Sequence, residues 1–325
     1  MNRRREKAMI KIKTTPNLYG VTLMGDYEDL DKLYDSISNY LSFYIDNADY
    51  YPYHEYEYLL SLNYDIRHCY MGDRGYEIVD NNSERYGSMA GVIFEPTEEF
   101  REEIRNVRGT HKKGNLYYTV EILYPLIFHY LIAFEEILLD EPDESWLEKE
   151  SEFGGKWGER YSMIDAKRDR AAISNLIGLF WDNMQELFGR DTAKNIYDYF
   201  NEVEYTLPSS MYCDALIHCQ LVNFPDMSRE EKLEFLLASI YEIIDVDNLT
   251  TYPKDYEPST SEYRNAVESL NKNGTPRFPV KEDFYDALDK VYDPQKPFYR
   301  EDFDRFLNET YGEYQDPFES GEFEW

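Results

Sequence analysis

Cysteine and histidine are both scarce in this chain of 325 residues. The three cysteines, Cys69, Cys213 and Cys219, form no CxxC pair and cannot build a disulfide framework. Reduced thiols in a cytoplasmic protein are therefore the simplest interpretation. The five histidines form neither HxxxH nor HExxH, so a zinc site is not expected. We predict no metal and no cofactor.

Long apolar runs and nucleotide-binding glycine loops are missing as well. The most apolar stretch, residues 124–139, is interrupted by His129, Glu135 and Glu136, whereas a membrane span needs roughly 18 apolar residues. The glycines fit neither GxGxxG nor GxxxxGKS/T, and no GxSxG nucleophile motif occurs. We therefore expect no membrane contact, and no motif identifies an enzyme class.

Basic residues are also scarce relative to acidic ones. The chain has 65 Asp and Glu against 34 Lys and Arg, which gives a formal net charge of −31. Such a surface repels nucleic-acid phosphate and anionic lipid and favours basic partners. The 42% apolar share and the 32 tyrosines suffice for a large core, because tyrosine buries its ring and keeps its hydroxyl wet. We expect an ordered acidic protein without direct nucleic-acid binding.

The chain divides into five expected regions. Residues 1–8 are basic and lack the apolar core of a signal peptide, so we expect a disordered leader with the true start at Met1 or Met9. The regions that follow are an α+β domain at 9–140, a linker or surface excursion at 141–170, a helical domain at 171–250 and an acidic aromatic tail at 251–325.

Hairpins mixed with separate helices make the first domain typical of an α+β layer. Period-two alternation predicts strands at 10–13 and 20–24, and a short strand at 77–79. Helical spacing of apolar residues predicts helices over 30–44, capped by Asp26, and over 59–69. Alternation over 116–122 predicts a half-buried strand, and Pro125 opens the helix after it. The predicted fold class is α+β, with an N-terminal antiparallel sheet and packed helices, followed by an all-α region.

The second domain has helical periodicity throughout. Apolar stripes predict helices over 173–188, 193–200 and 212–222. Ser228 with Glu231 three residues later forms a capping box that starts a fourth helix.

The tail contains a short internal repeat. Lys281-Glu282-Asp283-Phe284 recurs as Arg300-Glu301-Asp302-Phe303, and the matches continue from Leu288 to Leu307 and from Tyr292 to Tyr311. Each copy predicts a short acidic helix. Two copies are too few for a solenoid, so a helical hairpin packed on the body and a docking element that wraps a partner are the two interpretations.

Three stretches occur in a distinctive order along the chain. They are Thr15-Pro16-Asn17-Leu18-Tyr19-Gly20 leading into Gly25-Asp26-Tyr27, then Tyr64-Asp65-Ile66-Arg67-His68, and then Asn115-Leu116-Tyr117-Tyr118 leading into Ile122-Leu123-Tyr124-Pro125. Together they resemble an uncharacterised bacterial family, classed as a domain of unknown function, over roughly residues 9–139. The resemblance implies a fold and a bacterial origin but no activity, and it does not extend to the helical half or the tail.

The densest polar group supplies the candidate catalytic residues, which are Asp65, Arg67, His68, Asp73 and Arg74. Asp65 and His68 are spaced i and i+3 and share a helix face, so the carboxylate could orient the imidazole for general-base work. Ordinary ion pairs on the helix surface and contact with a ligand or partner are the alternatives.

Aromatic residues with acidic neighbours form a second set of candidates. Because the neighbouring charge is negative, protein recognition is favoured over the stacking of nucleic-acid bases. The candidates for partner binding are Tyr51, Tyr53, Tyr56, Phe284, Phe303 and Tyr311.

These observations lead to three hypotheses. The first is a non-catalytic interaction protein that engages a basic protein surface, as an immunity protein, an inhibitor or a defence-associated component, with DNA mimicry as its sharper form. The second is an enzyme of unknown class built around Asp65 and His68, which a deep pocket lined by His68 would favour. The third is a structural or assembly subunit, possible as an oligomer, which a contiguous apolar tyrosine patch would favour.

Overall fold

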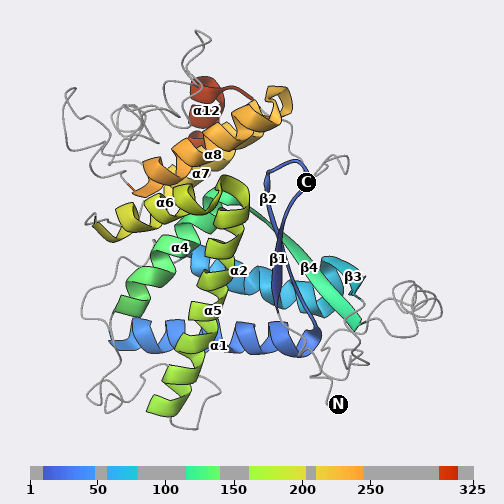
Figure 1. The fold of residues 1–325 in the computed structure, drawn as a ribbon, viewed down its shortest axis with the longest axis vertical. Coiled ribbons are helices and arrows are strands. Elements are labelled where there is room, and N and C mark those ends of the chain that lie inside the picture. The colour runs from blue at the N-terminus through green and yellow to red at the C-terminus, as the bar shows by residue number, and fades with distance from the viewer. Residues whose placement is uncertain are drawn as a thin grey trace. The chain divides into compact units, whose positions relative to one another are not determined.

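The computed structural model of the chain describes residues 10–47, 57–79, 115–139, 161–202, 210–244 and 300–313. A small sheet precedes a series of helices, so the protein is α+β with an all-α C-terminal part, as predicted (Figure 1). The leader at 1–8, Tyr51, Tyr53, Tyr56 and Phe284 lie outside the described residues. The elements are β1 (Lys11–Thr14), β2 (Gly20–Gly25), α1 (Tyr27–Asn47), α2 (Glu57–His68), η1 (Cys69–Asp73), β3 (Gly75–Val79), β4 (Asn115–Leu123), α4 (Tyr124–Leu139), α5 (Met163–Phe188), α6 (Arg190–Glu202), α7 (Ser210–Asn223), η4 (Phe224–Asp226), α8 (Arg229–Ile244) and α12 (Arg300–Tyr311).

The sheet has four strands in the order β1-β2-β4-β3. The predicted hairpin at its start is confirmed, and its turn is closed by the Thr15 amide, which donates to the Gly20 carbonyl at 2.9 Å. Leu18 in this turn has a φ of 65°, a left-handed conformation that is uncommon for a residue other than glycine. At the other edge β3 pairs antiparallel with β4, with Gly75 opposite Thr119.

The strand at 116–122 differs from its prediction, because β4 is buried on both faces. Leu116 and Val120 are 2% and 3% exposed, and the residues expected to face solvent, Tyr117 and Thr119, are 0% and 4% exposed. The prediction of a half-buried strand is therefore wrong. β4 lies between β2 and β3 in the sheet, and a strand covered on both faces loses the inside–outside alternation that the prediction assumes.

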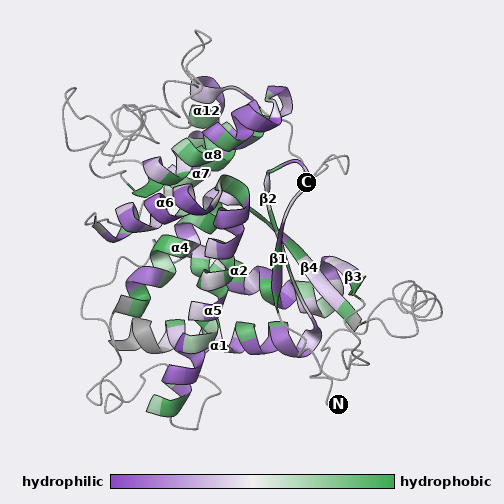
Figure 2. Ribbon diagram, viewed as in Figure 1, coloured by the Kyte–Doolittle hydropathy of each residue, from purple (hydrophilic) through white to green (hydrophobic). Residues whose placement is uncertain are grey.

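Local sequence signals set the helix starts. The Asp26 carboxylate accepts a hydrogen bond from the Asp29 amide at 3.0 Å, so the predicted cap of α1 is confirmed. The capping box of α8 is also formed, with the Ser228 amide 2.8 Å from the Glu231 carboxylate and the Glu231 amide 3.3 Å from the Ser228 hydroxyl. Pro125 stands in the first turn of α4, whose residues are largely hydrophobic along its length (Figure 2).

Helix α5 begins earlier than the sequence suggests. It starts at Met163, inside the expected linker at 141–170. The Ser162 amide donates to Asp165 at 3.1 Å and the Asp165 amide donates to the Ser162 hydroxyl at 3.2 Å, which makes a capping box. Serine followed three residues later by an acid was the sequence signal for this start.

Packing groups the chain into two compact units, neither of which is one continuous stretch. Unit 1 comprises 1–13, 22–122 and 134–180, and unit 2 comprises 14–21, 123–133 and 181–325. Each surface described below lies within one unit. No helix in the described part of the chain is long and apolar enough to span a bilayer.

Candidate functional site

The five predicted catalytic residues lie around the end of α2 in unit 1. The last turn of α2 passes directly into the π-helical turn η1, and Gly72 there has a φ of 91°, which favours glycine. This turn reverses the chain before β3 begins at Gly75. Residues from before and after the turn therefore meet, and the structure brings all five candidates into one small region.

Four of the five residues pair with one another. The His68 Nδ1 atom lies 2.8 Å from the Asp73 carboxylate, and the Arg74 guanidinium donates to Asp65 at 2.7 Å. The carboxylate beside the imidazole is thus Asp73, not Asp65 as the helical spacing suggests. Ion pairs this accessible contribute about 0–1 kcal/mol, and they hold the turn against the helix end.

The aromatic surroundings of His68 are equally local. The Tyr64 ring lies 4.1 Å from the His68 ring between centroids, and the Arg67 guanidinium carbon lies 5.3 Å from the Tyr64 centroid. The adjacent thiol of Cys69 is fully buried, and burial raises its pKa, so it is held protonated and is not a nucleophile. This arrangement can stabilise a turn, but it presents no reacting group beside the imidazole.

A different cluster in unit 1 places two neighbouring carboxylates beside tyrosine rings. Tyr27, Asp31, Tyr34 and Asp35 follow one stripe of α1, because Asp31 is four residues after Tyr27, and Tyr34 and Asp35 are three and four residues after Asp31. The turn η1 adds Tyr70, whose ring centroid lies 5.3 Å from that of Tyr27 and 6.1 Å from that of Tyr34, both edge-on. We call these five residues the aspartate–tyrosine face.

The two carboxylates of this face carry charge that is poorly compensated. Burial raises the pKa of Asp31, against the opposing effects of a hydrogen bond from Tyr70 and of Lys32. Burial also raises the pKa of Asp35, and the neighbouring carboxylates Asp31 and Asp169 raise it further, while Arg168 opposes them. A nearby positive charge would therefore be favourable at this face.

Asp169 places a fixed negative charge next to that face. It is 1% exposed and accepts hydrogen bonds from the Ser36 hydroxyl at 3.1 Å and the Tyr161 hydroxyl at 3.0 Å. The Arg168 guanidinium donates to it at 3.2 Å. Burial and this carboxylate together raise the pKa of Tyr161, which remains a neutral donor. The hydrogen bonds hold Asp169 in a position that Asp35 senses electrostatically.

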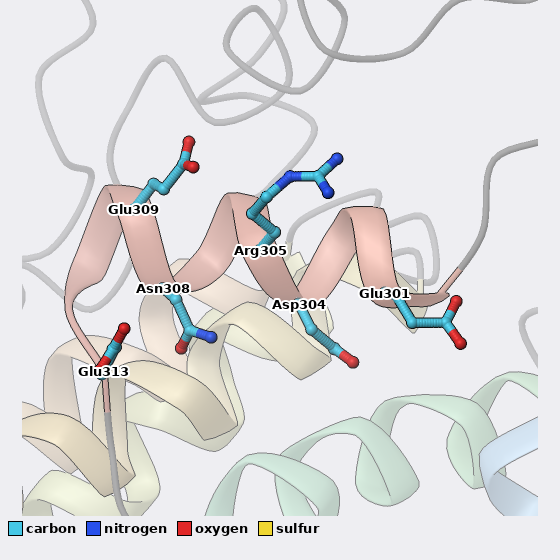
Figure 3. A pocket seen from close by; sticks show the side chains of 6 residues that line it. All are labelled: Glu301, Asp304, Arg305, Asn308, Glu309 and Glu313. Carbon is cyan, nitrogen blue, oxygen red and sulfur yellow. The ribbon is translucent and has the colours of Figure 1, made fainter.

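A second acidic surface lies on α12 in unit 2. Figure 3 shows the side chains that line a cavity of about 440 Å³ and project from α12 and from Glu313, two residues after its end. The lining holds four carboxylates against one guanidinium, and that guanidinium, Arg305, pairs with Asp302 at 2.5 Å. The lining residues are Glu301, Asp304, Arg305, Asn308, Glu309 and Glu313. His68 is not among them.

The predicted tail residues are divided between the interior and the edge of unit 2. Phe303 is 2% exposed, so its ring belongs to the internal packing of α12 rather than to the surface. Tyr311 is partly exposed, and its ring centroid lies 6.5 Å from that of His218. A partner could reach Phe303 only if α12 left its place.

The aspartate–tyrosine face was not among the sequence-based candidates. The sequence predicted the apolar stripe of α1, in which Leu30, Leu33 and Ile37 are all at most 2% exposed. The two aspartates lie on α1 outside that stripe. A search of the remaining positions for acids spaced four residues apart would have found Asp31 and Asp35. No local pattern links Tyr70 to α1, because the contact depends on how the chain reverses at η1.

Comparison with known proteins identifies a family without assigning an activity. No curated protein and no solved structure is significantly similar to this chain. A family described as Domain of unknown function (DUF6904) matches residues 10–276. The match runs well past the 9–139 inferred from the sequence, so the helical half is also part of the family pattern, whereas α12 lies beyond it. Because the match covers most of its length, the chain belongs to the family described as Domain of unknown function (DUF6904).

Proposed function

We propose that the protein is a non-catalytic interaction protein that binds a basic protein surface through the aspartate–tyrosine face of α1. The observation that carries this proposal is the pair Asp31 and Asp35, a partly buried and an exposed carboxylate that repel each other beside Tyr27, Tyr34 and Tyr70. A lysine or arginine of a partner would relieve the repulsion between the carboxylates. The tyrosine rings would add cation–π attraction to the same group.

The charge of the whole chain supports the same partner chemistry. A net charge of −31 speeds the encounter with a cationic surface and disfavours nucleic acid. The outer surface of α12 adds four carboxylates on unit 2. The proposed roles are those of an immunity protein, an inhibitor or a defence-associated component in a bacterial cytoplasm, where buried free thiols such as Cys213 would stay reduced. In the DNA-mimic version of this proposal, the protein occupies a basic groove in which the partner normally binds nucleic acid.

The enzyme hypothesis has less support than the interaction hypothesis. Asp65 and His68 each already hold a charged partner, Arg74 and Asp73 respectively. The cavity on α12 lies on a different unit and contains none of them. These facts favour local ion pairing at the end of α2.

The proposal is tested by measuring affinity for a fluorescent oligo-arginine peptide at low salt. The double variant Asp31→Asn with Asp35→Asn removes two charges from the face, and Asp226→Asn with Glu230→Gln removes two exposed charges from η4 and α8. We expect the first variant to lose about tenfold in affinity, which corresponds to ~1.4 kcal/mol, and the second to lose much less.

Affinity purification from the native host, at low and at high salt, then identifies the natural partner. A basic protein retained at low salt by the parent chain, but lost with the Asp31/Asp35 variant, supports the proposal. Equal losses of peptide affinity in both double variants would show that general charge rather than this face is responsible, and the proposal would be abandoned. Failure to retain any basic protein at low salt would also count against it.

A further inference from the structure

Helix α12 is held along α7 by a contact at each of its ends. At its start, the Arg300 guanidinium pairs with Asp214. At its end, His218 Nε2 lies 2.6 Å from the Gly312 carbonyl oxygen, and a Cβ placed on Gly312 would lie 3.6 Å from the Val222 side chain. Asp214, His218 and Val222 follow one stripe of α7. We call this stripe the α7 seat.

The chemistry of the seat is specific at both ends. A carbonyl oxygen only accepts hydrogen bonds, so His218 must carry a proton on Nε2. Burial lowers the pKa of His218, so the ring is neutral and donates from this nitrogen. Between the ends, α12 buries Phe303, Phe306 and Leu307, which are 2%, 6% and 3% exposed. The seat thus selects a cation, an apolar helix face and a free carbonyl.

The tail repeat carries the same features in the same order. Lys281 stands where Arg300 meets Asp214, and the matching apolar positions are Phe284 for Phe303 and Leu288 for Leu307. Tyr292 corresponds to Tyr311, which lies beside His218. The first copy lies outside the described residues, but its sequence keeps the cation and two of the three apolar residues that α12 buries.

Most positions on the opposite side of the helix are not kept, although the exposed Glu301 is repeated as Glu282. The outer residues Asp304, Arg305, Asn308 and Glu309 correspond to Tyr285, Asp286, Asp289 and Lys290 in the first copy. The net charge of these four positions is −1 in both copies, so the outer side keeps its acidity but not its residue types. Solubility alone accounts for that acidity but gives no reason to repeat the Phe and Leu that α12 buries.

Two inner differences make the first copy the weaker match. Ala287 replaces Phe306, so less apolar surface is available for burial. Asp293 replaces Gly312, whose φ of 103° is strained for any residue with a side chain. Both differences favour α12 as the main occupant, which is the arrangement in the structure.

We propose that the α7 seat is a docking site for a short helical motif, and that residues 281–292 of the same chain are its second occupant, in exchange with α12. The motif begins with four consecutive residues, namely a cation, Glu, Asp and Phe. A Leu follows four residues after the Phe, and a Tyr follows four residues after the Leu. Both copies are tethered to the seat by the same chain, so each competes at the high effective concentration of an intramolecular ligand. Both lie beyond residue 276, whereas the seat lies inside the family match. This exchange is independent of the aspartate–tyrosine face.

Disulfide trapping in the full chain tests the exchange. Asp293 is the counterpart of Gly312, so Val222→Cys with Asp293→Cys reports the first copy in the seat, and Val222→Cys with Gly312→Cys reports α12. Val222→Cys with Ser269→Cys is the control for a tail residue outside the motif. The native thiols do not interfere, because Cys69, Cys213 and Cys219 are all buried. Non-reducing gels and peptide mass mapping measure the rate and the site of cross-linking.

We expect the first copy to cross-link within one molecule about a hundredfold more slowly than α12, because it lacks the Phe306 ring. It should still cross-link at least about tenfold faster than the Ser269 control. Ala287→Phe should raise its rate by restoring the missing ring, and Phe284→Asp should lower it to the control rate.

A rate no higher than that of the Ser269 control, or a rate unchanged by Phe284→Asp, would overturn the proposal. Cross-links found only between two molecules would overturn exchange within one chain. Gly312→Cys alters α12 itself and strains the left-handed backbone there, so the α12 cross-link gives a lower bound, whereas the comparison of the first copy with the Ser269 control does not depend on that variant.

Discussion

Replacing Asp35 with Asn should stabilise the protein at neutral pH even though it weakens the proposed binding face. Asp35 stands one helical turn after Asp31, and a like-charged pair at this spacing costs ~0.2–0.5 kcal/mol. The Asp169 carboxylate adds to the repulsion, while solvent screening at the exposed Asp35 reduces it. We expect a gain of about 0.5 kcal/mol in the free energy of unfolding, which raises the melting temperature by about 1–2 °C.

The gain should depend on pH in a defined direction. Burial and neighbouring carboxylates raise the folded-state pKa of Asp35 above its ordinary value of 3.8. The folded protein therefore holds this proton more tightly than the unfolded chain does, and stability is lost as pH rises from below 3.8 through the raised pKa. Asn cannot ionise, so the advantage of the variant is full at about pH 7 and fades below the ordinary aspartate pKa.

Denaturant unfolding followed by circular dichroism measures the difference in stability between the variant and the parent protein. The measurement is made at about pH 7 and below the ordinary aspartate pKa, in low and in high salt. The matched control is Glu28→Gln, which removes the same charge from the first turn of α1. An acid in that turn is favoured by the helix dipole, so its loss should destabilise the protein by ~0.3–1 kcal/mol. If Asp35→Asn lowers stability at neutral pH, or if its effect does not change with pH, the argument about uncompensated charge at Asp35 is wrong.

The remaining predictions concern interior groups. Asp169→Ala leaves buried hydroxyl donors without an acceptor, so the urea midpoint should fall by the equivalent of ~2–4 kcal/mol, whereas Asp198→Ala, which breaks an exposed pair with a lysine, should cost at most ~0.5 kcal/mol. Ser228→Ala removes one half of a capping box and should lower the free energy of unfolding by ~1 kcal/mol, and an unchanged midpoint would show that the cap contributes nothing. Cys213 should resist iodoacetamide in the native state and react fully in urea, because burial raises its thiol pKa; equal labelling in both states would contradict this.

The features that could be predicted are those made by residues close together in sequence. The hairpin at the start of the sheet, the Asp26 cap and the Ser228 capping box each depend on groups no more than a few residues apart. The apolar stripes of α1 and α5 were visible because the helical period is short compared with the helix. The start of α5 at Ser162 had an equally local signal, which was overlooked.

The features that could not be predicted depend on contacts between distant segments. Burial of the second face of β4 requires other segments to pack against that face, which no alternation within residues 116–122 records. Asp169 meets Ser36 across 133 positions, and Tyr70 meets α1 only because the chain reverses at η1. The pairing of His68 with Asp73 likewise needed the turn geometry, since helical spacing alone pointed to Asp65.

The π-helical turn η1 makes the aspartate–tyrosine face sensitive to chain length as well as to composition. A π-turn accommodates one more residue per hydrogen-bonded ring than an α-turn, and successive residues in a helix are rotated by about 100°. Inserting one residue between His68 and Tyr70 would therefore rotate Tyr70 away from Tyr27 and Tyr34 while leaving all five residues of the face in the chain. Relatives of this chain that differ by an insertion or a deletion at this point would share the fold and lack the face.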